Sequence, residues 1–175
     1  MFGKISIIGC GLIGSSILRA TQEKKLATKI SVYDKSNKVI EYLKKNFTAD
    51  ICSNVSETTK DADLIIISAP LSSYKEILLS IKSTLKEGSI LTDTGSAKKE
   101  VNKIVNNLGL KNISWIASHP IAGTEYSGPA AGFSSLFKNR WCILSADKQV
   151  AKDKIENLEK FWSKLGSKVK VMSFE

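Results

Sequence analysis

The sequence has few of the side chains that build covalent cross-links or metal centres. Its three cysteines (Cys10, Cys52 and Cys142) are scattered and odd in number, and they form no CxxC pair or cluster with histidine. This arrangement argues against a disulfide framework and against a zinc site. We expect no metal site, and we expect the cysteines to be small buried side chains in a reducing compartment.

Long apolar segments are also missing. No apolar run approaches the ~18 residues that a membrane helix needs. The apolar stretch after Lys4 loosely resembles a signal peptide, but only nine residues precede Cys10, too few for a charged region and an apolar region together. We therefore expect a cytoplasmic protein without a membrane partner.

Arginine is scarce although the chain is strongly basic. The formal net charge is +9, but lysines supply nearly all of it, and Arg19 and Arg140 are the only arginines. The lysines are spread over every expected helix, whereas a nucleic-acid site more often gathers arginine and aromatic side chains on one surface. We expect no nucleic-acid partner, and instead a solvated lysine surface that helps to attract anionic small molecules.

Short apolar runs alternate with segments of helical period along all 175 residues. The nearly continuous apolar run over 64–68 indicates a central parallel strand buried on both faces. Regular βαβ alternation predicts a doubly wound, mostly parallel α/β sheet, and we predict a single Rossmann-type dinucleotide-binding domain over 1–175. The expected strands are 4–8, 29–33, 64–68, 89–92, 114–117, 141–144 and 169–171, and the expected helices lie around 12–25, 39–47, 77–85, 101–108 and 155–165.

A GxGxxG motif follows the first expected strand and opens the first expected helix. It consists of Gly9, Gly11 and Gly14, with Leu12 and Ile13 between the last two glycines. In this context the first glycine permits a tight turn, the second lets the backbone approach a pyrophosphate, and the third lets helix and strand pack closely. Free N–H groups at the helix N-terminus then bind the phosphates. The motif predicts a dinucleotide site.

Asp34 stands twenty residues after Gly14, at the end of the second expected strand. A carboxylate at that place accepts hydrogen bonds from the adenosine ribose and repels a 2′-phosphate, which favours NAD over NADP. Lys35 beside it offsets part of the repulsion, so NADP use stays open. Capping of the helix after Ser36 is a second, compatible role for Asp34.

Two further strand ends are expected at the same crevice, because ligands of such sheets bind outside the carboxyl ends of the strands. Ser68, Ala69 and Pro70 leave the buried strand and either line the cofactor crevice or form a simple strand exit. After the next strand, Asp93 and Thr94 are expected to organise the turn beneath the cofactor.

Polar residues that suit chemistry follow two later strands. Ser96 closes the sequence Asp-Thr-Gly-Ser after one strand, and the only histidine, His119, is expected directly after the next, before a proline and a glycine-rich loop. A lone histidine is more often structural than catalytic, but its titration range and its place after a strand suit acid–base chemistry. Both roles stay open on these residues alone.

Three motifs in this order, GxGxxG, DTGS and SHPIAGTE, resemble the prephenate dehydrogenases and their relatives, the arogenate and cyclohexadienyl dehydrogenases. The resemblance implies NAD-dependent oxidative decarboxylation of prephenate to 4-hydroxyphenylpyruvate, or of arogenate to tyrosine, in tyrosine biosynthesis. It implies that His119 accepts a hydrogen bond or the proton of the substrate hydroxyl, and that Ser96 shares that bond or fixes the imidazole. Thr124 and Glu125 then orient the substrate and the mouth of the site, with a solvated loop carboxylate as the alternative for Glu125.

In the resembled family a helical domain follows, with dimer contacts and an arginine that grips the ring carboxylate. Neither Arg19 nor Arg140 replaces that arginine within these 175 residues. We expect this chain, if it is a fragment, to bind NAD but to turn over substrate poorly, and we expect a homodimer only with the helical domain. Two alternatives stay open: another nicotinamide-dependent dehydrogenase of small acids, and an NAD-binding module without turnover.

Overall fold

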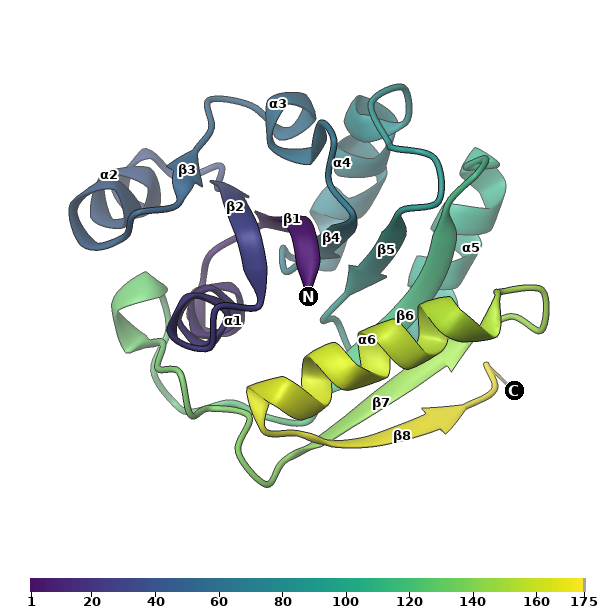
Figure 1. Cartoon of the computed structure of the whole chain (residues 1–175). Helices are drawn as coiled ribbons and strands as arrows, with labels where there is room; N and C mark the ends of the chain where they lie inside the picture. Colours follow the sequence, from purple (N-terminus) through teal and green to yellow (C-terminus); the bar gives the residue numbers. More distant parts are fainter. Residues whose placement is uncertain (175) are drawn as a thin grey trace.

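Eight strands lie side by side in one sheet in the computed structural model, which describes residues 1–174. Their order across the sheet is β3-β2-β1-β4-β5-β6-β7-β8, as Figure 1 shows. Neighbouring strands are parallel except for β6 and β7, which are antiparallel. The strands are β1 (Phe2–Ile8), β2 (Ala27–Tyr33), β3 (Asp50–Ile51), β4 (Leu64–Ile67), β5 (Ile90–Asp93), β6 (Ser114–Pro120), β7 (Trp141–Ala146) and β8 (Lys168–Met172).

Helices cover both faces of the sheet, and each face has its own apolar cluster. One cluster includes side chains from α1, α2 and α6, and the other is packed by α3, α4 and α5 (Figure 1). The helices are α1 (Leu12–Glu23), α2 (Asn37–Asn46), α3 (Val55–Thr59), α4 (Tyr74–Ile81), α5 (Lys98–Leu108) and α6 (Lys152–Leu165), with short 3-10 turns η1 (Leu71–Ser73) and η2 (Pro129–Ala131).

The central strand β4 explains why a continuous apolar run is needed here. Leu64 and Ile66 point into one cluster, whereas Ile65 and Ile67 point into the other, and all four are buried. Successive side chains of a strand point to opposite faces, so a sheet covered on both faces needs apolar residues at every position. The expected doubly wound, mostly parallel α/β fold is confirmed.

The expected place of His119 directly after a strand is wrong, because His119 lies inside β6. That strand continues to Pro120 by pairing with β7, and His119 stands opposite Ile143. The expected strand over 114–117 is therefore too short. The connection from β6 to β7 contains the short turn η2 but no α-helix, so β7 returns antiparallel instead of completing a βαβ unit.

Two short elements, β3 and α3, are also absent from the expected elements. β3 has two residues, and α3 has five, too few for an apolar period to be visible in the sequence. α3 matters for the site, because its first residue, Val55, lines the pocket described below.

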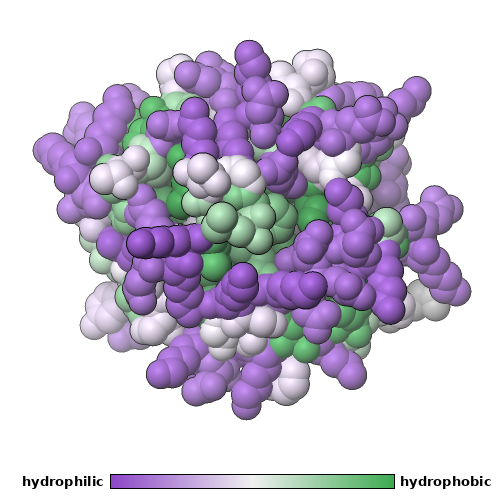
Figure 2. Space-filling view, viewed as in Figure 1, coloured by the Kyte–Doolittle hydropathy of each residue, from purple (hydrophilic) through white to green (hydrophobic). Residues whose placement is uncertain are grey.

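The surface is dominated by hydrophilic side chains on the face that Figure 2 shows, with smaller apolar areas between them. Within residues 1–174, no helix combines the length and the apolar character that crossing a membrane requires. The same part of the chain holds no group of three or more histidine, cysteine, aspartate or glutamate side chains suited to a metal ion. The three cysteines are free, and Cys10 and Cys142 are buried as expected, whereas the expectation of burial is wrong for Cys52, which is half-buried.

Candidate cofactor pocket and active site

The glycine turn between β1 and α1 is built by close contacts that admit no side chain. Gly9 has φ +89°, and a Cβ there would lie 2.6 Å from the carbonyl oxygen of Ser68. A Cβ on Gly14 would overlap the carbonyl oxygen of Gly9. These two glycines therefore let β1, α1 and the end of β4 pack together.

Gly11 differs from the other two glycines, because a Cβ at its position would meet no protein atom within 4 Å. It is the N-cap of α1, and it has no side chain to bond the free amides of the first turn. Leu12 and Ile13, the first helical residues, line the adjacent pocket, and the first turn contains no acidic residue. Amides and helix dipole are thus left available for an anion.

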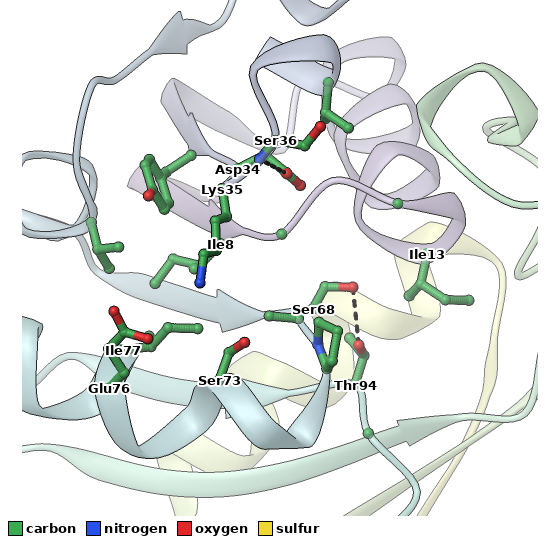
Figure 3. A pocket seen from close by; sticks show the side chains of 18 of the residues that line it. Ile8, Ile13, Asp34, Lys35, Ser36, Ser68, Ser73, Glu76, Ile77 and Thr94 are labelled. Carbon is green, nitrogen blue, oxygen red and sulfur yellow. Dashed lines mark hydrogen bonds between the residues drawn. The ribbon is translucent and has the colours of Figure 1, made fainter.

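A pocket of about 760 Å³ opens beside this turn, at the carboxyl ends of β1, β2, β4 and β5. In Figure 3, Asp34 and Ser36 lie on one side of it, and Ser73, Glu76 and Ile77 from η1 and α4 lie on the opposite side. Its volume is in the range of sites for small molecules and cofactors. All expected cofactor residues except Gly14 line it: Gly9, Gly11, Leu12, Ile13, Asp34, Ser68, Ala69, Pro70 and Thr94.

Asp34 is fixed at the pocket edge by two main-chain amides. Its Oδ2 accepts a hydrogen bond from the N–H of Cys10 at 2.7 Å, and its Oδ1 accepts one from the N–H of Ser36 at 2.8 Å. The second bond stands just before α2, so the carboxylate shapes this turn while it also lines the pocket. Lys35 also lines the pocket beside it.

The strand exits after β4 and β5 are joined directly beneath the pocket. The hydroxyl of Thr94 donates to Ser68 Oγ at 3.1 Å, a bond drawn in Figure 3, and the N–H of Thr94 donates to the carbonyl oxygen of Ile67 at 3.0 Å. These bonds hold the two exits in one surface, of which Ala69 and Pro70 form part.

Asp93, one residue earlier, is fully buried and bonded on all sides. Its carboxylate accepts hydrogen bonds from Lys98 Nζ at 2.6 Å, the N–H of Gly95 at 3.1 Å, the hydroxyl of Tyr74 at 3.2 Å and the N–H of Ser118 at 3.3 Å. Burial raises the pKa of Asp93, and the Lys98 ammonium acts against that rise. Asp93 therefore organises the turn that carries Thr94 and Ser96.

His119 is half-buried near the end of β6. Burial lowers its pKa below the ordinary value, and the positive charge of Lys98 lowers it further. The imidazole is consequently neutral near pH 7, the form that can accept a proton. Ser96 is exposed on the turn after β5, and among the described residues no hydrogen bond joins it to His119. Hydrogen bonds of Asp93 and Lys98 instead connect their neighbours, Gly95 and Ser118.

Thr124 and Glu125 lie in the exposed loop after β6 and do not line the cofactor pocket. Thr124 Oγ1 accepts a hydrogen bond from the N–H of Tyr126 at 3.2 Å, which shapes the loop locally. The structure thus separates the expected residues into a cofactor group around the pocket and a second group, with Ser96 and His119, outside it.

Several residues of the pocket wall are not indicated by any motif. Glu76 and Ile77 on α4, Val39 on α2 and Val55 on α3 complete the pocket wall. Lys98 has a recognisable sequence position, because it is the first residue of α5. The helix dipole disfavours a cation there, so a lysine at this position indicates an acidic partner.

Known proteins with similar sequences identify the family of this chain. The sequence profile of the family described as "Prephenate dehydrogenase, nucleotide-binding domain" matches residues 17–171. The cyclohexadienyl dehydrogenase of Zymomonas mobilis is 34% identical over 176 residues, which cover 100% of this chain and 60% of that protein. The prephenate dehydrogenase of Lactococcus lactis is 34% identical over 159 residues, or 89% of this chain and 44% of that protein.

A solved structure shares both the fold and part of the sequence. Prephenate dehydrogenase from Aquifex aeolicus, crystallised in complex with hydroxyphenyl propionate and NAD+, superposes with a TM-score of 0.85 at 26% identity. The match covers 99% of this chain and 60% of that one. The chain thus spans at most about 60% of the length of these three relatives. It belongs to the prephenate dehydrogenase family and matches the nucleotide-binding domain of that family.

Proposed function

We propose that this chain binds NAD in the pocket beside the glycine turn and serves the oxidative decarboxylation of prephenate or arogenate. The main evidence for NAD binding is the uncapped N-terminus of α1, which lies next to the Asp34 carboxylate that two main-chain amides hold in place. The first suits a pyrophosphate, and the second suits a ribose diol. The Aquifex relative with NAD+ and a hydroxyphenyl ligand supports the same reading.

The proposed reaction removes a hydride from the hydroxyl-bearing carbon of the substrate ring. NAD, when bound, supplies the hydride acceptor; the developing ketone then withdraws electrons, carbon dioxide leaves and the ring becomes aromatic. His119 accepts the hydroxyl proton, for which a neutral imidazole is suited, and returns it to the phenolate oxygen that forms when the ring becomes aromatic. Ser96 shares the hydrogen bond to that hydroxyl, and Thr124 and Glu125 in the neighbouring loop orient the substrate.

Neither of the two arginines lines the pocket. Arg140 is exposed next to β7, and Arg19 bonds Tyr42 and the carbonyl oxygen of Pro129 away from the pocket lining. We infer that a further domain supplies the group that binds the ring carboxylate, together with the contacts of a homodimer. NAD chemistry and three free cysteines agree with a cytoplasmic setting.

Two measurements test this function. Titration calorimetry with NAD and with NADP should show binding of NAD and weaker binding of NADP. Hydride transfer should then be assayed with prephenate and with arogenate. NAD binding without turnover would leave the cofactor assignment standing and favour a binding module, whereas a chain that binds neither nucleotide contradicts the proposal.

Replacement of Asp34 by alanine should weaken NAD binding roughly tenfold or more, because a charge-assisted hydrogen bond to the ribose is lost. Affinity for NADP should fall less or rise, because the repulsion of the 2′-phosphate is removed. Calorimetry with both nucleotides gives the ratio. Lys35→Ala is the matched control, since it removes the opposite charge and should shift the ratio further toward NAD. An unchanged ratio in Asp34→Ala would contradict the ribose assignment.

A further inference from the structure

β5 and β6 pair only over their first residues and separate toward their carboxyl ends. The two strands pair through Ile90 with Ser114 and Leu91 with Trp115. From Ile116 onward β6 pairs with β7 on its other side. The ends of β5 and β6 therefore carry Ser96 and His119 without a shared main-chain ladder to fix their relative position.

Beyond the last main-chain pairing of β5 with β6, side chains connect the two strands. Asp93 Oδ1 accepts hydrogen bonds from the N–H of Ser118 at 3.3 Å and from Lys98 Nζ at 2.6 Å. Lys98 Nζ also donates to the carbonyl oxygen of Ser118. The two main-chain polar groups of the residue before His119 are thus both held by one ion pair.

The side chain of Ser118 is held as well. Its hydroxyl lies 2.6 Å from Thr92 Oγ1 on β5 and accepts a hydrogen bond from Trp162 Nε1 on α6 at 3.1 Å. Ser118, Thr92 and Trp162 are all fully buried. Three elements therefore converge on the residue that precedes His119, and β6 has little freedom to rotate there.

The same ion pair holds the turn on which Ser96 stands. Asp93 accepts the N–H of Gly95, one residue before Ser96, at 3.1 Å. Lys98 follows Ser96 by two residues, and its side chain is only 19% exposed. The pair of Asp93 and Lys98 consequently bonds both to the turn of Ser96 and to the main chain that precedes His119. Neither residue lines the cofactor pocket.

The charged groups that shift the pKa of His119 are Lys98 and Asp93. Lys98 on α5 lowers the pKa of His119, and Asp93 on β5 raises it by a smaller effect. Cys142 on β7 is buried, which raises the pKa of its thiol to about 12, and burial also raises the pKa of Tyr74 on α4 behind Asp93. The thiol and the phenol are therefore uncharged near pH 7, and the ion pair sets the local field.

We propose that Asp93 and Lys98 are positioning residues that hold the Ser96 turn and His119 in a fixed relation, with the Lys98 ammonium bonded to the main chain of the residue that precedes His119. This assignment rests on the proposed function only for the role of His119 in the reaction. A pair that merely stabilises the fold would change the unfolding free energy when mutated, but it would not change the titration of the imidazole in a chain that stays folded.

Because His119 is the only histidine, its ring signals in an NMR titration of this chain need no assignment. The wild-type pKa should lie below 6.5. Lys98→Gln should raise it, and Lys98→Arg, which keeps the charge, should leave it near the wild-type value. Lys99→Gln is the matched control, because Lys99 is exposed on the same helix and should have no effect.

A second variant covers the case in which Lys98→Gln leaves Asp93 unpaired and does not fold. Asp93→Asn/Lys98→Gln removes both charges but keeps amide groups that can hydrogen-bond. Because the effect of Lys98 exceeds that of Asp93, the pKa of His119 should again rise. Hydrogen exchange at the amide of Ser118 should quicken roughly tenfold in the same variant, since its charged acceptor is gone.

The outcomes separate this inference from the proposed function. NAD affinity, measured by calorimetry, should be unchanged in Lys98→Arg, because this variant keeps a cation for Asp93 and Lys98 does not line the pocket. Folded Lys98 variants whose His119 titrates as in Lys99→Gln would overturn the positioning role. A wild-type chain that fails to bind NAD would instead overturn the proposed function, and the titration would still be readable.

Discussion

Replacement of Gly14 by alanine should lower the free energy of unfolding by about 2–3 kcal/mol, because the new methyl group overlaps the main-chain carbonyl of Gly9. A clash with backbone cannot be relieved by a rotamer change, so either β1 or α1 has to move. The same movement displaces the first-turn amides of α1, and NAD binding should fall to an undetectable level. Denaturant unfolding gives the stability, and calorimetry gives the affinity.

Gly11→Ala is the matched control for this result. Its methyl group meets no protein atom within 4 Å, and the residue has φ −69°, which alanine adopts readily. Its stability should stay within about 1 kcal/mol of the wild type, the cost of a poorer N-cap. NAD binding should still weaken strongly, since Gly11 lines the pocket and the added methyl group occupies open space next to the free amides of α1. Normal NAD binding by Gly11→Ala would contradict that placement.

The contrast between these glycines marks what the sequence can predict. Gly9 and Gly14 are close to each other along the chain, and their spacing alone indicates a strand, a tight turn and a helix. The apolar run of β4 likewise indicates a strand covered on both faces. Local patterns of this kind predicted seven of the eight strands and five of the six α-helices that residues 1–174 form, and nine of the residues that line the pocket.

The remaining features depend on contacts between distant segments. The length of β6, and with it the place of His119 inside a strand, depends on pairing with β7, more than twenty residues away in the chain. The bond from Asp93 to Ser118 spans 25 residues, and no local period reports it. Short elements such as α3 give no visible period, although Val55 completes the pocket wall.

His119→Asn should reduce hydride transfer by roughly 10²- to 10⁴-fold, the usual contribution of a general base, while NAD affinity stays unchanged. Asparagine can still hydrogen-bond, but it cannot take the hydroxyl proton. His119 does not line the cofactor pocket, so calorimetry with NAD should give the wild-type value. Turnover is best measured in a chimaera that joins this chain to the remaining part of the Zymomonas mobilis relative, with which it shares 34% identity.

The pH dependence separates a base from a residue that only shapes the site. A base works in its neutral form, so kcat/KM of the wild-type chimaera should rise with pH through the pKa of His119. Burial and Lys98 lower that pKa, which places this acid limb below pH 6.5. The His119→Asn chimaera should retain a small rate without the limb. Loss of NAD affinity in parallel with the rate, or an acid limb that persists in the variant, would show that His119 is structural and that the proton goes elsewhere.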